Sequence, residues 1–240
     1  MNLQQLLEYR TLPKTNQWNG GHLVFRFAFY LIIACFSVIY ALGYRFNLQR
    51  GGFEQTGAIV YTISGSPDGV QISLNGVVKK PSIPGRFLYL LPGSYEISFA
   101  APGYQPWTST FNLGSNRAVH LDEVLLIKTS ETSPLVASTR TTLPRINRDG
   151  LEVLHTIEIW GDGKFLTRLS KAVSNVAWYS DNQHFVYQTE NTLWIYDPES
   201  NVTQLLATLP SNLPATYGFT DSGRTLVVQQ NDVFLQRSIR

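Results

Sequence analysis

The stretch Phe27-Ala-Phe-Tyr-Leu-Ile-Ile-Ala-Cys-Phe-Ser-Val-Ile-Tyr-Ala-Leu-Gly-Tyr44 contains no charged residue. In a helix that rises about 1.5 Å per residue it would span roughly 27 Å, close to the thickness of the hydrocarbon core of a bilayer. The apolar run Leu23-Val-Phe25 extends it toward the amino end. The sequence therefore predicts a transmembrane helix over residues 23–44, which follows a hydrophilic cytoplasmic tail, residues 1–22.

Two other interpretations of this stretch are weaker. A buried helix of a soluble core carries polar residues at helical spacing, and these are missing here. Ala41-Leu-Gly43 resembles the small-x-small cleavage site of a signal peptide, so a cleaved signal is the stronger alternative. The apolar core is longer than the usual core of about 7–15 residues in a signal peptide, and a long tail precedes it. An uncleaved signal anchor is the favoured interpretation.

The charges on either side of the predicted span indicate its orientation. Arg10, Lys14 and Arg26 lie on the amino side, together with the terminal amine, whereas Arg45 and Arg50 follow the span. Because cytoplasmic flanks carry the excess of Lys and Arg, this slight bias favours a cytoplasmic N-terminus. We therefore expect a single-pass cell membrane protein whose C-terminal domains are extracytoplasmic and whose first partner is the lipid bilayer.

The composition fits an envelope protein. The net charge is only +2 and the 19 Lys and Arg residues are scattered, so the sequence does not indicate the concentrated basic face that nucleic acid needs. The single cysteine, Cys35, lies in the apolar stretch, which leaves the rest of the chain without a disulfide framework. This pattern favours a bacterial or archaeal envelope over a small secreted eukaryotic protein.

Two segments have the composition of connections between folded parts. Residues 45–56 are polar and contain Gly51-Gly52, which predicts a short flexible stalk after the span. Residues 129–150 are rich in Ser and Thr and lack a sustained period, which predicts a linker with room for one short strand. These connections delimit two candidate domains, residues 57–128 and 151–240.

The first candidate domain, residues 57–128, has the pattern of β-strands. Apolar and polar residues alternate through Val70–Leu74, and the next dipeptide, Asn75-Gly76, suits the positive φ angles of a type I′ hairpin. Alternation through Trp107–Leu113 places Trp107 on the core side. Turns rich in Pro and Gly recur about every ten residues, which predicts a small β-sandwich.

Four motifs follow one another in this region. They are Gly57-Ala-Ile-Val-Tyr-Thr-Ile-Ser64, Ser66-Pro-Asp-Gly-Val-Gln-Ile-Ser-Leu-Asn-Gly76, Leu90-Leu-Pro-Gly-Ser-Tyr-Glu-Ile-Ser-Phe99 and Ala101-Pro-Gly-Tyr-Gln-Pro106. In this order they resemble a PEGA domain, over nearly a third of the chain. The resemblance implies a sandwich of the carboxypeptidase-regulatory type that occurs outside the cytoplasm as a non-catalytic module.

The second candidate domain, residues 151–240, repeats with a period of 41. Shifting the sequence by 41 positions sets Trp178–Gln188 over Phe219–Gln229, and Val233–Arg237 follows Thr192–Asp197 at the same distance. Each unit combines an aromatic residue, a polar turn and a β-branched or aromatic strand. A period of about 40 with several strands per unit is typical of propeller blades.

The segment Val176–Tyr187, followed by Leu193–Asp197, is similar to repeats of WD-type and TolB-like propellers. This part of the chain holds only two or so such units, whereas a closed propeller needs about four to eight blades. The array must therefore dock on another part, assemble with other copies or belong to a longer product. A second β-sandwich is the alternative.

The expected fold class is mainly β. It comprises one N-terminal transmembrane helix, a small PEGA-like β-sandwich and antiparallel β-repeats that resemble two or so propeller blades.

Residues that could carry chemistry are scattered. The four histidines are isolated in sequence, without a second ligand at metal spacing: His22, His120, His155 and His184. Asp181, Asp197 and Asp221 recur in the repeats beside residues such as Asn, Ser and Pro, which is what turns require. The sequence accordingly predicts no catalytic residue, no cofactor and no metal site.

Aromatic residues are the remaining candidates for ligand contact. Rings on a binding face can stack on sugars. The four candidates are Tyr104, Tyr179, Trp194 and Tyr196.

Together these features predict a non-catalytic, membrane-anchored cell-envelope protein that presents extracytoplasmic β-domains to a protein or a cell-wall glycan. One alternative is an envelope enzyme, or the regulatory subunit of one. Another is a surface scaffold that assembles through open sheet edges, since unpaired edges promote association. An oligomer is compatible with the sequence.

Overall fold

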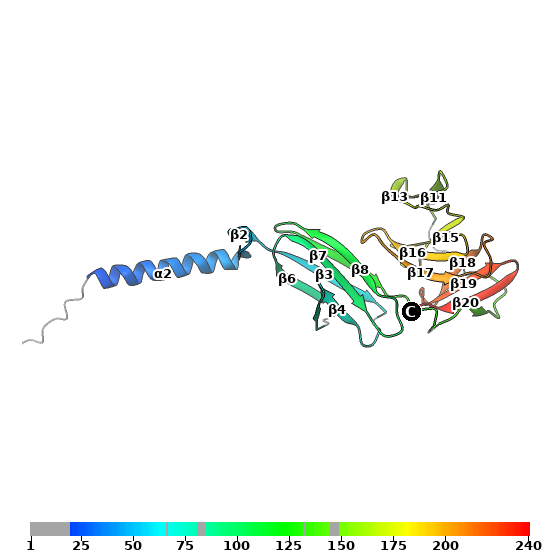
Figure 1. The fold of residues 1–240 in the computed structure, drawn as a ribbon, viewed down its shortest axis with the longest axis horizontal. Helices are drawn as coiled ribbons and strands as arrows, with labels where there is room; N and C mark the ends of the chain where they lie inside the picture. Colours follow the sequence, from blue (N-terminus) through cyan, green and yellow to red (C-terminus); the bar gives the residue numbers. More distant parts are fainter. Residues whose placement is uncertain (1–19, 66, 81–84, 132, 145–148) are drawn as a thin grey trace, which may run out of the picture. The chain divides into compact units, whose positions relative to one another are not determined.

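The computed structural model describes five stretches of the chain: 20–65, 67–80, 85–131, 133–144 and 149–240. They form one amino-terminal apolar helix followed by β-strands, so the mainly β fold class is confirmed (Figure 1). The chain divides into two compact units, of which the first ends at Thr56 and the second comprises Gly57–Arg240.

Helix α2 (Gly20–Ala41) covers most of the predicted span, residues 23–41. Its stretch His22–Ala41 is long and apolar enough to cross a membrane, and none of it is buried by the rest of the protein. Such a helix is compatible with a single-pass anchor or a signal sequence. It ends at Ala41, earlier than the predicted residue 44, because Gly43 adopts the left-handed conformation (φ +83°) that terminates helices.

Residues 45–56, predicted to be a flexible stalk, instead form most of a β-hairpin. Strand β1 (Tyr44–Asn47) pairs with β2 (Gly52–Gln55) in antiparallel register. The side chain of Asn47 sets the turn, because its Oδ1 accepts hydrogen bonds from two successive backbone N–H groups of the loop at 2.9 and 3.3 Å. A local Asx turn therefore orders a segment whose glycines suggested flexibility.

Within the described residues, seven strands of the second unit form the two sheets of a sandwich. They are β3 (Gly57–Ser64), β4 (Gln71–Leu74), β5 (Val77–Lys79), β6 (Gly85–Leu90), β7 (Gly93–Ala100), β8 (Trp107–Leu113) and β9 (Ala118–Leu125). One sheet has the order β5-β4-β7-β8 and the other β6-β3-β9. In the second sheet β3 pairs antiparallel with β6 and parallel with β9. The β4–β5 hairpin turns at Asn75-Gly76, whose φ angles of +50° and +75° confirm the predicted turn.

The sandwich encloses one apolar core. Buried and half-buried residues alternate along β3, as they do in a strand with one face toward a core. Tyr61 contacts Phe99 edge-on, with ring centroids 5.2 Å apart, and Phe99 contacts Trp107 in the same way at 5.3 Å. Trp107 is buried, which confirms the prediction from alternation.

Three further sheets lie in the described part of residues 133–240. Their strands are β10 (Val136–Ala137), β11 (Leu151–Leu154), β12 (Glu158–Gly161), β13 (Lys164–Arg168), β14 (Asn175–Trp178), β15 (Phe185–Thr189), β16 (Thr192–Asp197), β17 (Val202–Thr208), β18 (Thr216–Thr220), β19 (Thr225–Gln230) and β20 (Val233–Ser238). The sheets have the orders β11-β12-β13, β14-β15-β16-β17 and β10-β20-β19-β18. β14 and β18 begin at residues 175 and 216, which reproduces the period of 41. The up-and-down order resembles propeller blades, but the described sheets do not close a ring.

Strand β10 comes from the segment predicted to be a linker. It pairs antiparallel with β20, with Val136 opposite Gln236 and Ala137 opposite Leu235. The pairing continues at Ser138, whose backbone N–H donates to the carbonyl of Phe234 at 2.8 Å. An early segment of the chain thus supplies the fourth strand of the last sheet.

Two of the three sheets, β14-β15-β16-β17 and β10-β20-β19-β18, pack on the end of the sandwich through apolar contacts. Leu125, the last residue of β9, and Ile127 lie in one buried cluster with Leu206 of β17 and Leu226 of β19. The end of the sandwich and these two sheets therefore share one buried apolar cluster.

We expect Gly85→Ala to destabilise the sandwich. A Cβ atom at Gly85 would lie 1.7 Å from Cζ of Tyr61, whose buried ring is held by Phe87 and Phe99. Overpacking of this kind costs about 1–3 kcal/mol, measurable as a lower free energy of unfolding in urea. The matched control is Gly93→Ala, because a Cβ atom there meets no atom within 4 Å. Equal stability of the two variants would contradict this packing.

Candidate functional site

The four aromatic residues predicted to contact a ligand lie in different environments. Tyr179 is 1 % exposed and Tyr196 is 5 % exposed, so both rings lie in the interior of the sheets. Tyr104 packs against the sandwich core. Trp194 is half-buried and lines a groove. The structure thus does not bring the four rings together on one face, and it sets Trp194 apart from the other three.

The groove beside Trp194 has a volume of about 260 Å³ and is rich in hydroxyl groups. Its lining residues are Leu169, Ser170, Lys171, Tyr187, Thr189, Thr192, Trp194 and Thr203. The indole Nε1 of Trp194 donates hydrogen bonds to Oγ1 of Thr189 (3.1 Å) and Oγ1 of Thr192 (2.9 Å), which fixes the ring. A fixed aromatic ring beside several hydroxyl groups can stack on a ligand and hydrogen-bond to it. We call this site the Trp194 groove.

A buried acid–base pair lies in the turn between β14 and β15. Nδ1 of His184 is 2.7 Å from Oδ2 of Asp181, and Nε2 is 3.8 Å from Oδ2 of Asp197. His184 is 3 % exposed. Each aspartate also accepts backbone N–H groups of its own turn, which is the role that the sequence predicted. The ion pair was missed, although the spacing of three residues between Asp181 and His184 was a signal for it.

The two partners of this pair have shifted pKa values. Burial by itself would lower the pKa of His184, but the hydrogen bond and the charge of Asp181, with the charges of Asp197 and Glu123, raise it above its ordinary value of 6.5. Burial would raise the pKa of Asp181, but the hydrogen bonds and the charge of His184 hold it below its ordinary value of 3.8. Each partner therefore favours the charged form of the other, imidazolium beside carboxylate.

This pair makes stability depend on pH. Because the folded pKa of His184 is raised, its contribution is complete below about pH 6.5 and is lost as the pH rises through the folded pKa. The contribution of Asp181 is present above about pH 3.8 and is lost as the pH falls through its lowered pKa. Stability from the pair is therefore greatest in mildly acidic solution.

We expect His184→Gln to lower the free energy of unfolding by about 3 kcal/mol near pH 6, because it leaves the carboxylate of Asp181 without its cation. The loss should shrink as the pH rises through the folded pKa of His184, which lies above 6.5. Urea unfolding of the full chain in detergent, in a pH series that starts at 6, measures it. His155→Gln is the control, because that side chain is 81 % exposed. A loss for His184→Gln that does not change with pH would refute the ion pair.

Polar contacts join the sandwich to the sheet β14-β15-β16-β17, which we call the middle sheet. The side-chain amide of Gln105 pairs with the backbone of Leu205 in β17: its Nε2 donates to the carbonyl at 2.6 Å, and its Oε1 accepts the N–H at 3.1 Å. Ser109 of β8 donates from Oγ to the carbonyl of Ser200 at 2.7 Å. Two side chains of the sandwich therefore satisfy backbone groups of the sheets.

Arg237 of β20 reaches the same junction. Its buried guanidinium donates to the carbonyl oxygen of Leu206 in β17 and to that of Lys128, just beyond β9. Burial lowers the pKa of Arg237. One side chain of the last sheet therefore binds both the middle sheet and the end of the sandwich.

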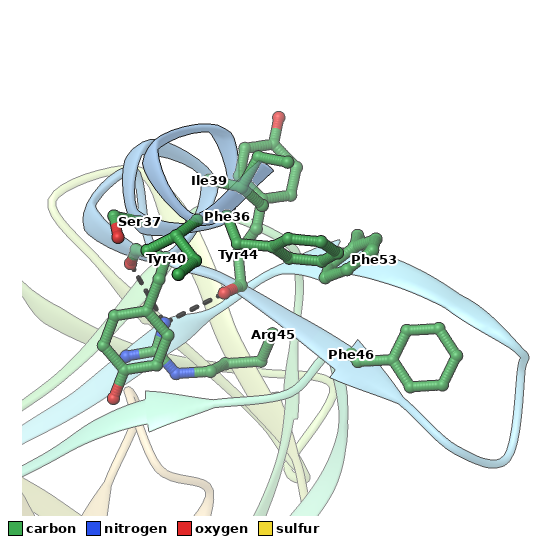
Figure 2. Close-up of a pocket in the computed structure, with 9 residues that line it drawn as sticks. Phe36, Ser37, Ile39, Tyr40, Tyr44, Arg45, Phe46 and Phe53 are labelled. Atoms are coloured by element: carbon green, nitrogen blue, oxygen red, sulfur yellow. Dashed lines mark hydrogen bonds between the residues drawn. The ribbon is translucent and has the colours of Figure 1, made fainter. Parts of the chain in front are cut away.

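A second groove, of about 890 Å³, belongs to the first unit and lies between the end of α2 and the β1–β2 hairpin (Figure 2). Its lining residues are Ile33, Phe36, Ser37, Ile39, Tyr40, Tyr44, Arg45, Phe46 and Phe53. The rings of Phe36 and Phe53 form one wall, with centroids 6.1 Å apart. The guanidinium of Arg45 lies 3.4 Å from the centroid of the Tyr40 ring and donates to the carbonyls of Tyr40 and Tyr44. We call this site the hairpin groove.

The described residues contain no group of three or more His, Cys, Asp or Glu side chains arranged to hold a metal ion. No protein-family model matches the chain, and a search of curated proteins gives no significant match. The two grooves and the buried ion pair are therefore the features from which a function can be argued.

Proposed function

We propose that the protein is a non-catalytic cell-envelope protein that α2 anchors in the membrane and that presents the β unit Gly57–Arg240 outside the cytoplasm to a protein or a cell-wall glycan. One observation carries the proposal: an apolar helix with no buried part belongs to the same chain as a compact β unit. Such a helix is stable in lipid, and a compact unit offers a fixed surface to a partner.

The orientation of the anchor rests on the flanking charges. Arg10, Lys14 and Arg26 precede the apolar core of the helix, and Arg45 and Arg50 follow it. The excess on the amino side favours a cytoplasmic N-terminus. The resemblance of the sandwich to PEGA domains supports the same address for the β unit.

Two features favour binding over chemistry. The pair of His184 and Asp181 has the geometry of an acid–base couple, but His184 is buried, and a substrate would have to displace the surrounding core to reach it. The Trp194 groove, in contrast, opens at the surface and combines a ring with hydroxyl groups. We assign the ion pair to stability and the groove to ligand contact.

The orientation is tested by labelling a single introduced cysteine in intact cells. In a Cys35→Ser background, Lys79→Cys places a thiol on the exposed strand β5. We expect a membrane-impermeant maleimide to label it without lysis, because the β unit lies outside. Labelling only after lysis would contradict the orientation, and release of the chain from membranes by carbonate would contradict the anchor.

Glycan binding is tested by retention of the full chain, in detergent, on insoluble cell-wall glycan. An aromatic contact is worth about 0.5–1.5 kcal/mol beyond its buried area, so Trp194→Ala should weaken retention by up to about tenfold. Trp160→Ala is the matched control, because that half-buried tryptophan packs on Phe165 and does not line the groove. Unchanged retention, or equal losses in both variants, would exclude the Trp194 groove as the glycan site and leave a protein partner.

A further inference from the structure

The hairpin after α2 exposes large apolar side chains. Phe46 is 51 % exposed, Leu48 88 % and Phe53 47 %. They follow directly on a helix that has no buried residue in its apolar stretch His22–Ala41. Water is an unfavourable environment for a continuous apolar surface of this kind.

Several contacts hold the hairpin at the carboxyl end of the helix. The ring of Phe53 packs on that of Phe36, and Arg45 donates to the carbonyl of Tyr40 at 3.0 Å (Figure 2). Thr56 donates to the carbonyl of Gly43 from both Oγ1 (2.8 Å) and its backbone N–H (3.0 Å). These contacts therefore hold the hairpin against the carboxyl end of α2.

We infer that the β1–β2 hairpin binds lipid at the membrane interface, and we call it the lipid-binding foot. It lies in the interface of the bilayer with Phe46, Leu48 and Phe53 among the acyl chains, and lipid chains fill the hairpin groove. This inference rests on the proposed anchoring of α2. It goes further, because a helix alone would span the bilayer equally well with a solvated stalk behind it.

The polar groups of the hairpin fit this location. Asn47 satisfies two N–H groups of the loop and donates from Nδ2 to Oε2 of Glu54 at 2.9 Å. Arg50 pairs with Oε1 of Glu54 at 3.0 Å. Backbone and side-chain groups that bind one another lower the cost of leaving water. Arg45 leaves the hairpin one positive charge in excess, which suits a leaflet with anionic headgroups.

The shape of the groove favours lipid over a transmembrane helix of a second protein. Helices associate in membranes through small residues that let their backbones approach. The hairpin groove is lined mainly by large side chains, among them Phe36, Ile39 and Phe53. Leu48, the most exposed of the apolar residues, does not line the groove at all. Flexible acyl chains can cover both surfaces, which a single docked helix cannot.

The test measures the depth of nitroxide labels on the full chain in vesicles of phosphatidylethanolamine and phosphatidylglycerol. Single cysteines are introduced by Leu48→Cys, Phe29→Cys and Lys79→Cys in a Cys35→Ser background. Collisions with oxygen report the bilayer interior, and collisions with a water-soluble nickel chelate report water. We expect the label at position 29 to collide mainly with oxygen, the bilayer pattern, and the label at position 79 to collide mainly with the nickel chelate, the water pattern. The label at position 48 should give a pattern shifted from water toward the bilayer.

Each outcome decides one question. A bilayer pattern at Phe29 with a water pattern at Leu48 would overturn the foot and leave the anchor intact. A water pattern at Phe29 would overturn the anchor and the foot together. A label at Leu48 that is shielded from both reagents would indicate a protein partner and would also overturn the foot.

A second measurement checks that the apolar side chains cause the depth. A label introduced by Gln49→Cys should shift toward the water pattern when Phe46 and Leu48 are both replaced by Ser. The replacement Val77→Ser/Val78→Ser, on the exposed strand β5, is the control and should leave the label unchanged. A label at Gln49 that gives the bilayer pattern in all three proteins would show that Phe46 and Leu48 do not hold the hairpin in lipid.

Discussion

The buried guanidinium of Arg237 is the constraint on which the β unit depends. It takes a charge out of water, which is costly, and only the carbonyl dipoles of Leu206 and Lys128 are found opposite it among the described residues. Both carbonyls are in place only when the last sheet, the middle sheet and the end of the sandwich meet at one point. The apolar contacts of Leu125 and Ile127 favour docking in general, whereas Arg237 specifies one docked arrangement.

The same junction bears on the alternative of a scaffold that assembles through sheet edges. An open edge strand offers unpaired N–H and C=O groups to another chain. On β17 the amide of Gln105 already binds both backbone groups of Leu205, and Arg237 binds the next carbonyl. The sandwich thus occupies part of an edge that a self-assembling array would need to keep open. This occupancy favours a unit that presents a surface over one that polymerises at β17.

Local patterns explain what the sequence could predict, and contacts between distant residues explain the rest. The helix, the Asn75-Gly76 turn and the burial of Trp107 depend on neighbours in the chain, so alternation and composition reveal them. The period of 41 is visible because the pattern itself recurs in the sequence. The pairing of β10 with β20 depends on residues about a hundred positions apart, which no local pattern encodes. The hairpin at 44–55 was missed because glycine suggested flexibility, while its signal lay in two phenylalanines within a polar segment. The burial of His184 likewise follows from packing.

The hydrogen-bond partners of the aromatic residues support the proposal that Trp194, and not the buried tyrosines, contacts a ligand. The hydroxyl of Tyr179 donates to the carbonyl of Gly223, and the hydroxyl of Tyr196 donates to Oδ1 of Asn201. Both hydroxyl groups therefore bind turns of the protein itself. A buried tyrosine needs such a partner, and these two are used for structure. The indole of Trp194 is held by Thr189 and Thr192, and Trp194 lines a groove. Fixing the ring before a ligand arrives removes part of the entropic cost of binding.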